Sequence, residues 1–164
     1  MLQARTTFQE TLASFNWVIP KHYNMGVDAC DKWADGSGRP ALLVETADGS
    51  TRQYSFDELK NWSDRFAQAL AAQGVQRGDR VGILLPQSLE TAIAHLAAYK
   101  LGAIAVPLFT LFGTEALQFR LGNSGARALI THHEGLAKIS SIQAQLPDLA
   151  CIFDIEAQVS DATR

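Results

Sequence analysis

The chain has 164 residues, 47% of them hydrophobic, which is enough to bury one full core, so a single domain is the first expectation. Its charged residues sum to −3, and we expect no nucleic acid partner, because a protein that holds a phosphate backbone needs a basic field. The two cysteines, Cys30 and Cys151, form no CxxC motif, which leaves a disulfide scaffold unsupported and fits a reducing compartment.

The N-terminal residues lack the charged start and the long apolar core of a secretory signal, so the expected location is the cytoplasm. The longest apolar stretch, residues 92–113, contains His95 and Lys100 and is interrupted by Gly102 and Pro107. We therefore expect no membrane span there and interpret the stretch as a buried helix followed by a buried strand.

The first 39 residues are predicted to form an irregular arm with one short helix. Val27, Cys30 and Ala34 have the spacing of one helical face. Gly36 to Pro40 then mark a loop, because glycine allows positive φ and proline disfavours helix before it. The predicted domain organisation is an arm over residues 1–39 and an α/β subdomain over residues 40–164.

A β-hairpin is predicted at the start of this subdomain. Residues 41–46 and 51–54 flank the Asp48-Gly49 pair, which supplies the positive φ values of a tight turn. The S-x-x-E motif at residues 55–58 then predicts a helix start, because each end side chain can satisfy the other's backbone N–H.

From residue 80 onward strands and helices alternate. The predicted strands are 80–85, 104–109, 127–131 and 151–153, and the predicted helices are 88–101, 114–122 and 135–145. Near-continuous apolar strands linked by helices indicate a parallel sheet that is covered on both faces. The predicted fold class is α/β, a doubly wound and mostly parallel sheet to which the hairpin is an antiparallel addition.

The local motifs predict no catalytic residue and no metal ligand in this chain. Residues 36–41 match a loose dinucleotide fingerprint, but they precede a strand, and Pro40 has no N–H to offer a phosphate. No Walker-type phosphate loop is present. Residues 132–134 are interpreted as a solvated loop, and His95 as a histidine packed in the core.

Several weak motifs recur at fixed separations from residue 54 onward. They are Tyr54-Ser55-Phe56-Asp57-Glu58-Leu59, Gly74-Val75-Gln76-Arg77-Gly78-Asp79-Arg80-Val81, Leu85-Pro86-Gln87, Lys100-Leu101-Gly102-Ala103 and Val106-Pro107-Leu108. Their order resembles that of the adenylate-forming superfamily. Residues 111–131, with 15–20 and 24–31 in the arm, are similar to acyl-CoA synthetases of the acetyl and medium-chain branch.

This resemblance implies an AMP-forming acid–thiol ligase. Such an enzyme activates a small carboxylic acid with ATP and Mg to an acyl-adenylate, which coenzyme A then converts to the thioester. In the family the phosphate-binding loop normally follows the position of Arg164. The chain is therefore expected to be the first part of the N-terminal domain, a scaffold that is inactive alone and binds none of these cofactors tightly.

The resemblance also implies one partial site. In the acetyl branch the turn that corresponds to Phe109, Thr110, Leu111 and Phe112 lies near the nucleotide of coenzyme A, where an aromatic ring can stack on adenine. Core packing of Phe109 and Phe112 is the competing interpretation. Basic residues after the next strand meet the coenzyme phosphates in that branch, and here only Lys138 corresponds to them.

A free-standing α/β binding or interaction module is the alternative function, because a fold alone does not fix function. The sequence encoded after Arg164 would distinguish the ligase fragment from the free-standing module. Within the superfamily, an acyl-AMP synthetase, an aryl-CoA ligase and a luciferase-like oxygenase also remain open. The predicted helix 88–101 is apolar around much of its circumference, so we expect an uncovered apolar face through which the chain self-associates.

Overall fold

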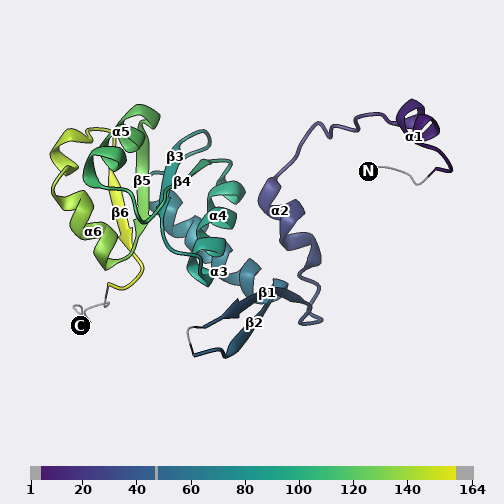
Figure 1. The fold of residues 1–164 in the computed structure, drawn as a ribbon, viewed down its shortest axis with the longest axis horizontal. Helices are drawn as coiled ribbons and strands as arrows, with labels where there is room; N and C mark the ends of the chain where they lie inside the picture. The colour runs from purple at the N-terminus through teal and green to yellow at the C-terminus, as the bar shows by residue number, and fades with distance from the viewer. Residues whose placement is uncertain (1–4, 47, 158–164) are drawn as a thin grey trace.

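The computed structural model describes residues 5–46 and 48–157 and centres on a four-stranded parallel sheet (Figure 1). The strand order is β4-β3-β5-β6. These strands are β3 (Arg80–Leu84), β4 (Ile104–Pro107), β5 (Ala126–Thr131) and β6 (Cys151–Asp154). A separate antiparallel pair, β1 (Pro40–Glu45) and β2 (Thr51–Ser55), forms the predicted hairpin.

Helices cover both faces of the parallel sheet, which confirms the doubly wound α/β fold. The helices of this part are α3 (Phe56–Ala72), α4 (Leu89–Leu101), α5 (Thr114–Ser124) and α6 (His133–Ser140). Figure 1 shows α3 and α4 on one side of the sheet and α5 and α6 on the other. Among the described residues no helix is long and apolar enough to cross a membrane.

Alternation along each strand produces two separate cores. On β3, Val81 and Ile83 pack in the cluster that contains the buried alanines of α4, whereas Leu84 packs in the cluster that contains Leu117 and Leu121 of α5. Successive side chains of a strand point to opposite faces, so a strand covered on both sides must be apolar throughout. This requirement is why the near-continuous apolar runs predicted the parallel sheet correctly.

Local signals placed the helix ends well in this part of the chain. Ser55 and Glu58 form the predicted capping box at the start of α3. Gly102 has a φ of 69°, a left-handed conformation that ends α4 without the steric cost a side chain would add.

The last predicted helix is wrong in its bounds, since α6 begins at His133 and a 3₁₀ turn, η2 (Gln143–Gln145), replaces its end. The hydroxyls of Ser140 and Ser141 donate to carbonyls of the preceding turn, at 2.9 and 2.8 Å. Such side-chain bonds compete with the backbone hydrogen bonds of the helix and help to end it early. At the other end, His132 is the N-cap residue, so residues 132–134 are a helix start and the interpretation as a solvated loop is wrong.

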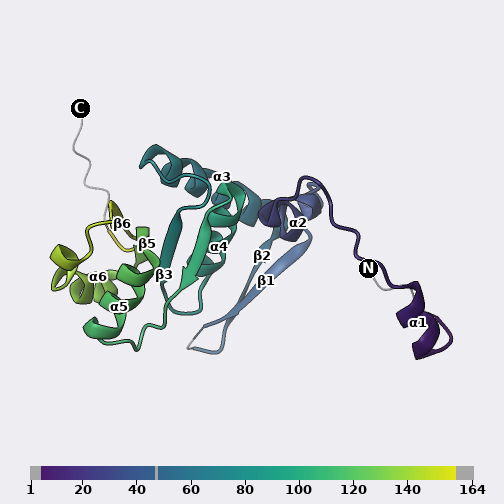
Figure 2. The same ribbon diagram turned by 90° about the horizontal axis from the view of Figure 1, so that it is seen from above.

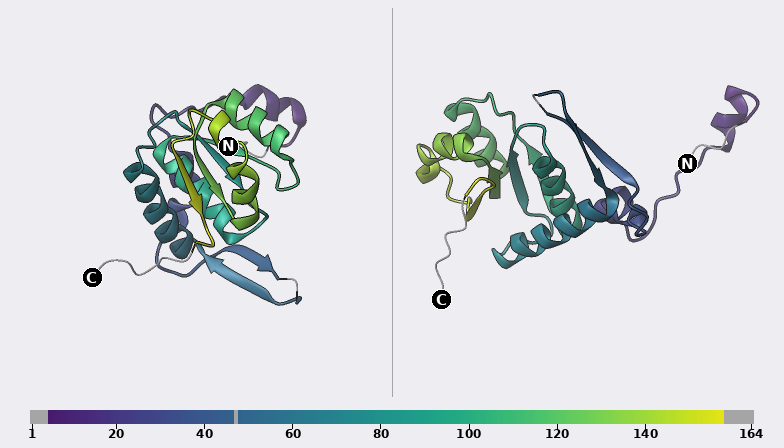
Figure 3. Two further views of the ribbon diagram at one scale, coloured as in Figure 1. Left: turned by 90° about the vertical axis from the view of Figure 1, so that its left-hand side faces the viewer. Right: turned by 90° about the horizontal axis from the view of Figure 1, so that it is seen from below.

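The N-terminal arm contains more regular structure than predicted. Besides the expected short helix α2 (Met25–Ala29), it forms α1 (Phe8–Ser14) and the 3₁₀ helix η1 (Asp31–Trp33). A capping box between Thr7 and Glu10 starts α1, and this signal was present in the sequence but overlooked. Helix α1 lies far from the sheet, whereas α2 lies beside α4 (Figures 2 and 3).

The docking of α2 changes the expectation for α4. Helix α4 contacts α2, α3 and the strands β3 and β4, so it is covered on several sides. No large apolar side chain of α4 is exposed. The uncovered apolar face predicted for this helix is therefore wrong, because the arm supplies part of the cover.

Candidate functional site

The cavity of interest lies at the carboxyl ends of β3 and β4 and has a volume of about 800 Å³. From β3 the chain continues into α4 on one face of the sheet, and from β4 it continues into α5 on the other face. In open α/β sheets ligands bind in the crevice where such connections diverge. The topology therefore marks this cavity as the candidate ligand site.

The cavity has a mixed lining that suits a partly apolar ligand with polar groups. Strand ends, the first half of α4, the loop after β4 and the hairpin all contribute to its wall. The apolar lining residues are Leu42, Ile83, Leu85, Pro86, Ala92, Pro107, Leu108, Phe109 and Phe112, and the polar ones are Gln87, Ser88, Thr91, His95, Thr110 and Arg120.

Three of the four residues predicted from the sequence lie in this wall, namely Phe109, Thr110 and Phe112. Leu111 is not among the lining residues, and its side chain is 82% exposed. The rings of Phe109 and Phe112 lie 6.0 Å apart at 51°, and Phe109 is 63% exposed. Phe109 is therefore not a core residue, and its ring is accessible to a planar ligand group. Phe112 is partly buried and packs against the cluster that contains Leu117, so core packing holds in part for this ring.

Two cations, Lys138 and Arg120, contact the turn at residues 109–112, and the sequence motifs pointed only to Lys138. The ammonium of Lys138 donates to the carbonyls of Thr110 and Phe112, at 2.7 and 3.3 Å. The guanidinium of Arg120 lies 4.3 Å from the ring centre of Phe112, within cation–π range. Lys138 thus fixes the backbone of the turn, and Arg120, to which the sequence motifs assigned no role in a site, is the cation that lines the cavity.

His95 also lines the cavity, so its interpretation as a packed core histidine is wrong. Its Nδ1 lies 2.8 Å from the carbonyl oxygen of Thr91, one turn earlier on α4. A carbonyl only accepts, so Nδ1 is the donor of this hydrogen bond. The side chain is half-buried because α4 enters the cavity wall along one edge, which helical spacing alone could not show.

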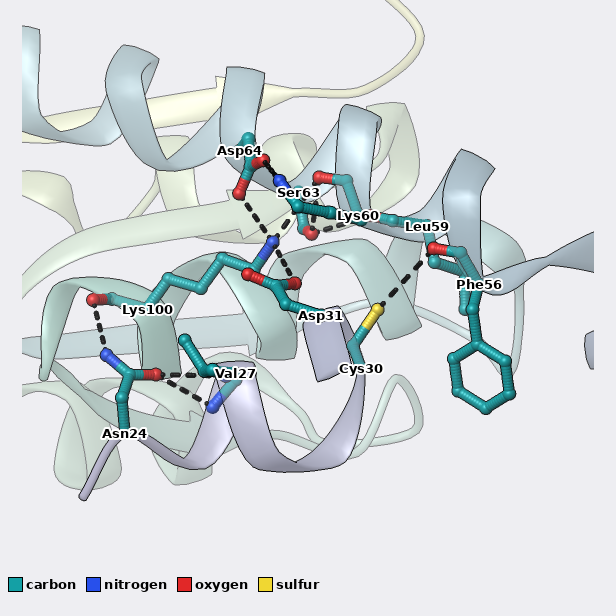
Figure 4. Close-up of polar contacts among 11 residues, drawn as sticks. Asn24, Val27, Cys30, Asp31, Phe56, Leu59, Lys60, Ser63, Asp64 and Lys100 are labelled. Carbon is teal, nitrogen blue, oxygen red and sulfur yellow. Dashed lines mark hydrogen bonds and ion pairs between the residues drawn. The ribbon is translucent and has the colours of Figure 1, made fainter. Parts of the chain in front are cut away.

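A second polar cluster joins the arm to the body (Figure 4). The ammonium of Lys100, 8% exposed, lies 2.7 Å from Asp31 Oδ1 of the arm and 2.6 Å from Asp64 Oδ1 of α3. Burial alone would raise the pKa of Asp64, but hydrogen bonds from Lys100 and Lys60 lower it below its ordinary value. The cluster balances two cations with two carboxylates in a partly buried position.

The backbone of the same region is equally specific. Asn24 caps α2 through its side-chain oxygen and donates from Nδ2 to the carbonyl of Lys100 at 2.9 Å. Gly26 lies so close to α4 that an added Cβ would come within 2.6 Å of Lys100 Cγ. Beside it, burial raises the pKa of the Cys30 thiol, which makes that cysteine a packing residue and a poor nucleophile.

The fold and the cavity thus define a doubly wound α/β protein with a cavity at the carboxyl edge of its sheet. Comparison with known families matches residues 30–163 to the AMP-binding enzyme model, so the chain belongs to the AMP-binding enzyme family. This match confirms the resemblance on which the sequence analysis relied.

Individual relatives agree with this assignment. Acetyl-coenzyme A synthetase of Bacillus subtilis is 32% identical over 95% of this chain and 29% of its own length. An acyl-CoA synthetase structure from Brucella canis superposes with a TM-score of 0.81 at 27% identity, over 96% of this chain and 30% of that one. The structure of the anthranilate CoA ligase AuaEII in complex with anthranoyl-AMP superposes with a TM-score of 0.76 at 34% identity, over 87% of this chain and 27% of that one. The chain therefore spans less than a third of each of these relatives.

Proposed function

We propose that this chain is the N-terminal part of a longer AMP-forming acid–CoA ligase. The observation that carries the proposal is the family match, which covers residues 30–163 of the 164. Acetyl-coenzyme A synthetase and anthranilate CoA ligase are similar to it at 32% and 34% identity, yet their names specify different acids. The proposal therefore names a carboxylic acid as the substrate and leaves its acyl group open.

The proposed reaction has two steps. A carboxylate oxygen of the acid attacks the α-phosphorus of ATP, the bond to the departing pyrophosphate breaks, and acyl-AMP forms. The thiol sulfur of coenzyme A then attacks the acyl carbon, AMP leaves, and the thiol proton is released. ATP, with Mg²⁺, and coenzyme A are substrates of the longer protein, and the groups that hold the phosphates are proposed to lie outside this chain.

The part that this chain contributes is proposed to be the coenzyme A side of the site. The ring of Phe109 is exposed at the cavity, which fits stacking on adenine, whereas Phe112 beside it is partly buried and packs against the cluster that contains Leu117. Thr110 and Leu111 complete the turn, and the bonds from Lys138 to its carbonyls restrain it. A restrained turn loses less conformational entropy when a ligand binds than a mobile one would.

The test uses the longer protein and separates the two steps. Phe109→Ala should raise KM for coenzyme A several-fold, because one stacked base is worth about 1–3 kcal/mol, and should leave carboxylate-dependent ATP–pyrophosphate exchange intact. Phe119→Ala, which removes a 67% exposed ring of α5 outside the cavity, is the matched control. Absence of carboxylate-dependent exchange in the longer protein would refute the ligase proposal itself.

We also propose that the 164-residue chain alone forms no acyl-adenylate and that it self-associates. Exposed apolar side chains support association, among them Trp17 and Ile19 of the arm, both 81% exposed, and Ile104 of the edge strand β4, 53% exposed. Sedimentation at micromolar concentration should show a dimer or larger species. A monodisperse monomer would contradict the second half of this proposal.

A further inference from the structure

A second cavity, of about 780 Å³, lies between the arm and the body, away from the sheet edge described above. Arm residues 20–24 and 27 form one wall, and Arg77 with residues 100–102 at the end of α4 forms the other. The two walls are at least 50 residues apart in sequence, so the cavity exists only because the arm docks on α4.

Two positive side chains that line this cavity have no partner among the described residues. Lys21 and Arg77 form no ion pair, hydrogen bond or ring contact with any residue in the described part of the chain, and both are exposed. His22 lies beside them. Two other exposed cations of the described ranges, Arg52 and Arg65, are also unpaired, but each stands outside the cavities.

The negative groups nearby are already engaged. The carboxylate of Asp28 accepts a hydrogen bond from Tyr23 at 2.9 Å and pairs with Lys32. At the end of α4, where the helix dipole would repel an anion, Asn24 donates to the carbonyl of Lys100 at 2.9 Å. The carbonyl of Gly102 accepts from Gly78 N–H at 3.0 Å. An anion in this cavity therefore meets the free cations Lys21 and Arg77, while the carbonyls of Lys100 and Gly102 are already satisfied.

Arg77 is held in place although its charge is unpaired. Its aliphatic part lies against Gly102, where an added Cβ would come within 3.1 Å of Arg77 Cγ. Packing of the stem restricts the guanidinium, which reduces the entropy lost when it binds an anion. The remaining lining is apolar or aromatic and includes Pro20, Val27 and Tyr23, whose side chain is 62% exposed.

We propose that this cavity binds a small molecule that carries a phosphate group, with Lys21 and Arg77 as the phosphate-binding residues. A guanidinium binds phosphate oxygens through two parallel hydrogen bonds, and an ammonium adds a point charge. Tyr23 offers a ring beside them, so a nucleotide and free phosphate share the required chemistry and differ only in whether they use this ring. The proposal does not depend on the ligase activity proposed above.

The experiment is a titration of the 164-residue chain with inorganic phosphate and with AMP at low ionic strength, followed by amide NMR and calorimetry. Amide shifts should concentrate at residues 21–24, 77–78 and 101–102. Arg77→Met should weaken binding of both probes about tenfold, because it removes the charge-assisted hydrogen bonds that the guanidinium donates to phosphate oxygens. Arg65→Met, which removes an equally exposed and unpaired cation from α3, should change neither affinity by more than about twofold.

Each remaining outcome decides the proposal. AMP that binds more tightly than phosphate, with the gain lost in Tyr23→Ala, supports it and identifies a nucleotide as the source. Equal binding of the two probes supports it with phosphate alone. No saturable binding of either probe, shifts elsewhere, or equal weakening by Arg65→Met and Arg77→Met would overturn it. Unchanged amide spectra of the free variants ensure that a loss of affinity is not a loss of fold.

Discussion

The sheet body and the N-terminal arm are held by different forces. In the body, two apolar clusters on opposite faces of one sheet involve most strands and helices at once. In the arm, residues 24–31 are held by the amide cap of Asn24, the close contact of Gly26, the Lys100 ion-pair cluster and the buried side chain of Cys30. Apolar burial is spread over many contacts, whereas each contact of the arm is specific and has no substitute.

This difference means that single substitutions should act on different scales in the two regions. A core substitution in the body should lower the stability of the whole sheet, because its helices share that core. A substitution at the junction should release the arm and leave the sheet folded, since the arm contributes no strand to the parallel sheet. The arm also forms one wall of the second cavity, so its release has a functional consequence.

The largest effect is expected from Leu129→Ala. Leu129 is fully buried at the centre of β5, and truncating such a residue costs about 2–5 kcal/mol in transfer and cavity terms. Urea unfolding followed by circular dichroism should show this loss in a single transition. Ile104→Ala, at a 53% exposed position of the edge strand, is the control and should cost less than about 1 kcal/mol.

Next in size is Lys100→Met, which leaves Asp31 and Asp64 without their shared cation. Removing one partner of a buried pair costs about 3–5 kcal/mol, and the partial exposure of Asp64 reduces this to about 2 kcal/mol. Hydrogen exchange should show faster exchange at residues 26–30 and little change in β3 and β5. Lys60→Met, which breaks a 42% exposed pair with the same Asp64, should cost about 0.5 kcal/mol or less. Equal effects of the two variants would disprove the junction as the main anchor of the arm.

Gly26→Ala tests close approach without changing any charge. The new Cβ would lie 2.6 Å from Lys100 Cγ and 3.1 Å from the carbonyl oxygen of Leu96, so α2 must move away from α4. We expect a cost of about 1–2 kcal/mol, as for overpacking in a core, again seen as faster exchange in the arm. Gly113→Ala meets no atom within 4 Å and has a negative φ, so it should be neutral within about 0.5 kcal/mol. Retention of protected arm amides in Gly26→Ala would contradict the proposed contact.

The smallest effect concerns acid. The folded-state pKa of Asp64 lies below its ordinary value of 3.8, so this carboxylate adds stability above the unfolded-state pKa that is lost as pH falls through the folded-state pKa. Partial exposure keeps the contribution under about 1 kcal/mol. Between about pH 5 and about pH 3, a range around the ordinary pKa of Asp, the free energy of unfolding should therefore fall more in the parent chain than in Asp64→Asn. Parallel pH profiles would show that Asp64 is not stabilised by its two lysines.

Much of this protein was determined by its sequence, because the relevant interactions are local. Strand alternation, the capping box at Ser55 and the glycine after α4 each depend on residues within a few positions of one another. The turn at residues 109–112 was likewise recognised from a contiguous motif, and three of its residues do line a cavity. The overlooked α1 and the early end of α6 were failures of the same kind of local reasoning.

Only the tertiary structure decided which distant residues meet. Lys138 reaches the carbonyl of Thr110 across 28 residues, and Lys100 meets Asp31 through the docking of α2. The exposure of His95 depends on where α4 crosses the edge of the sheet. Nothing in the spacing of these residues encodes their distances, because the position of one element against another is fixed by the sum of all packing contacts. The cavity at the sheet edge and the second cavity, between the arm and the body, both depend on such packing of distant elements.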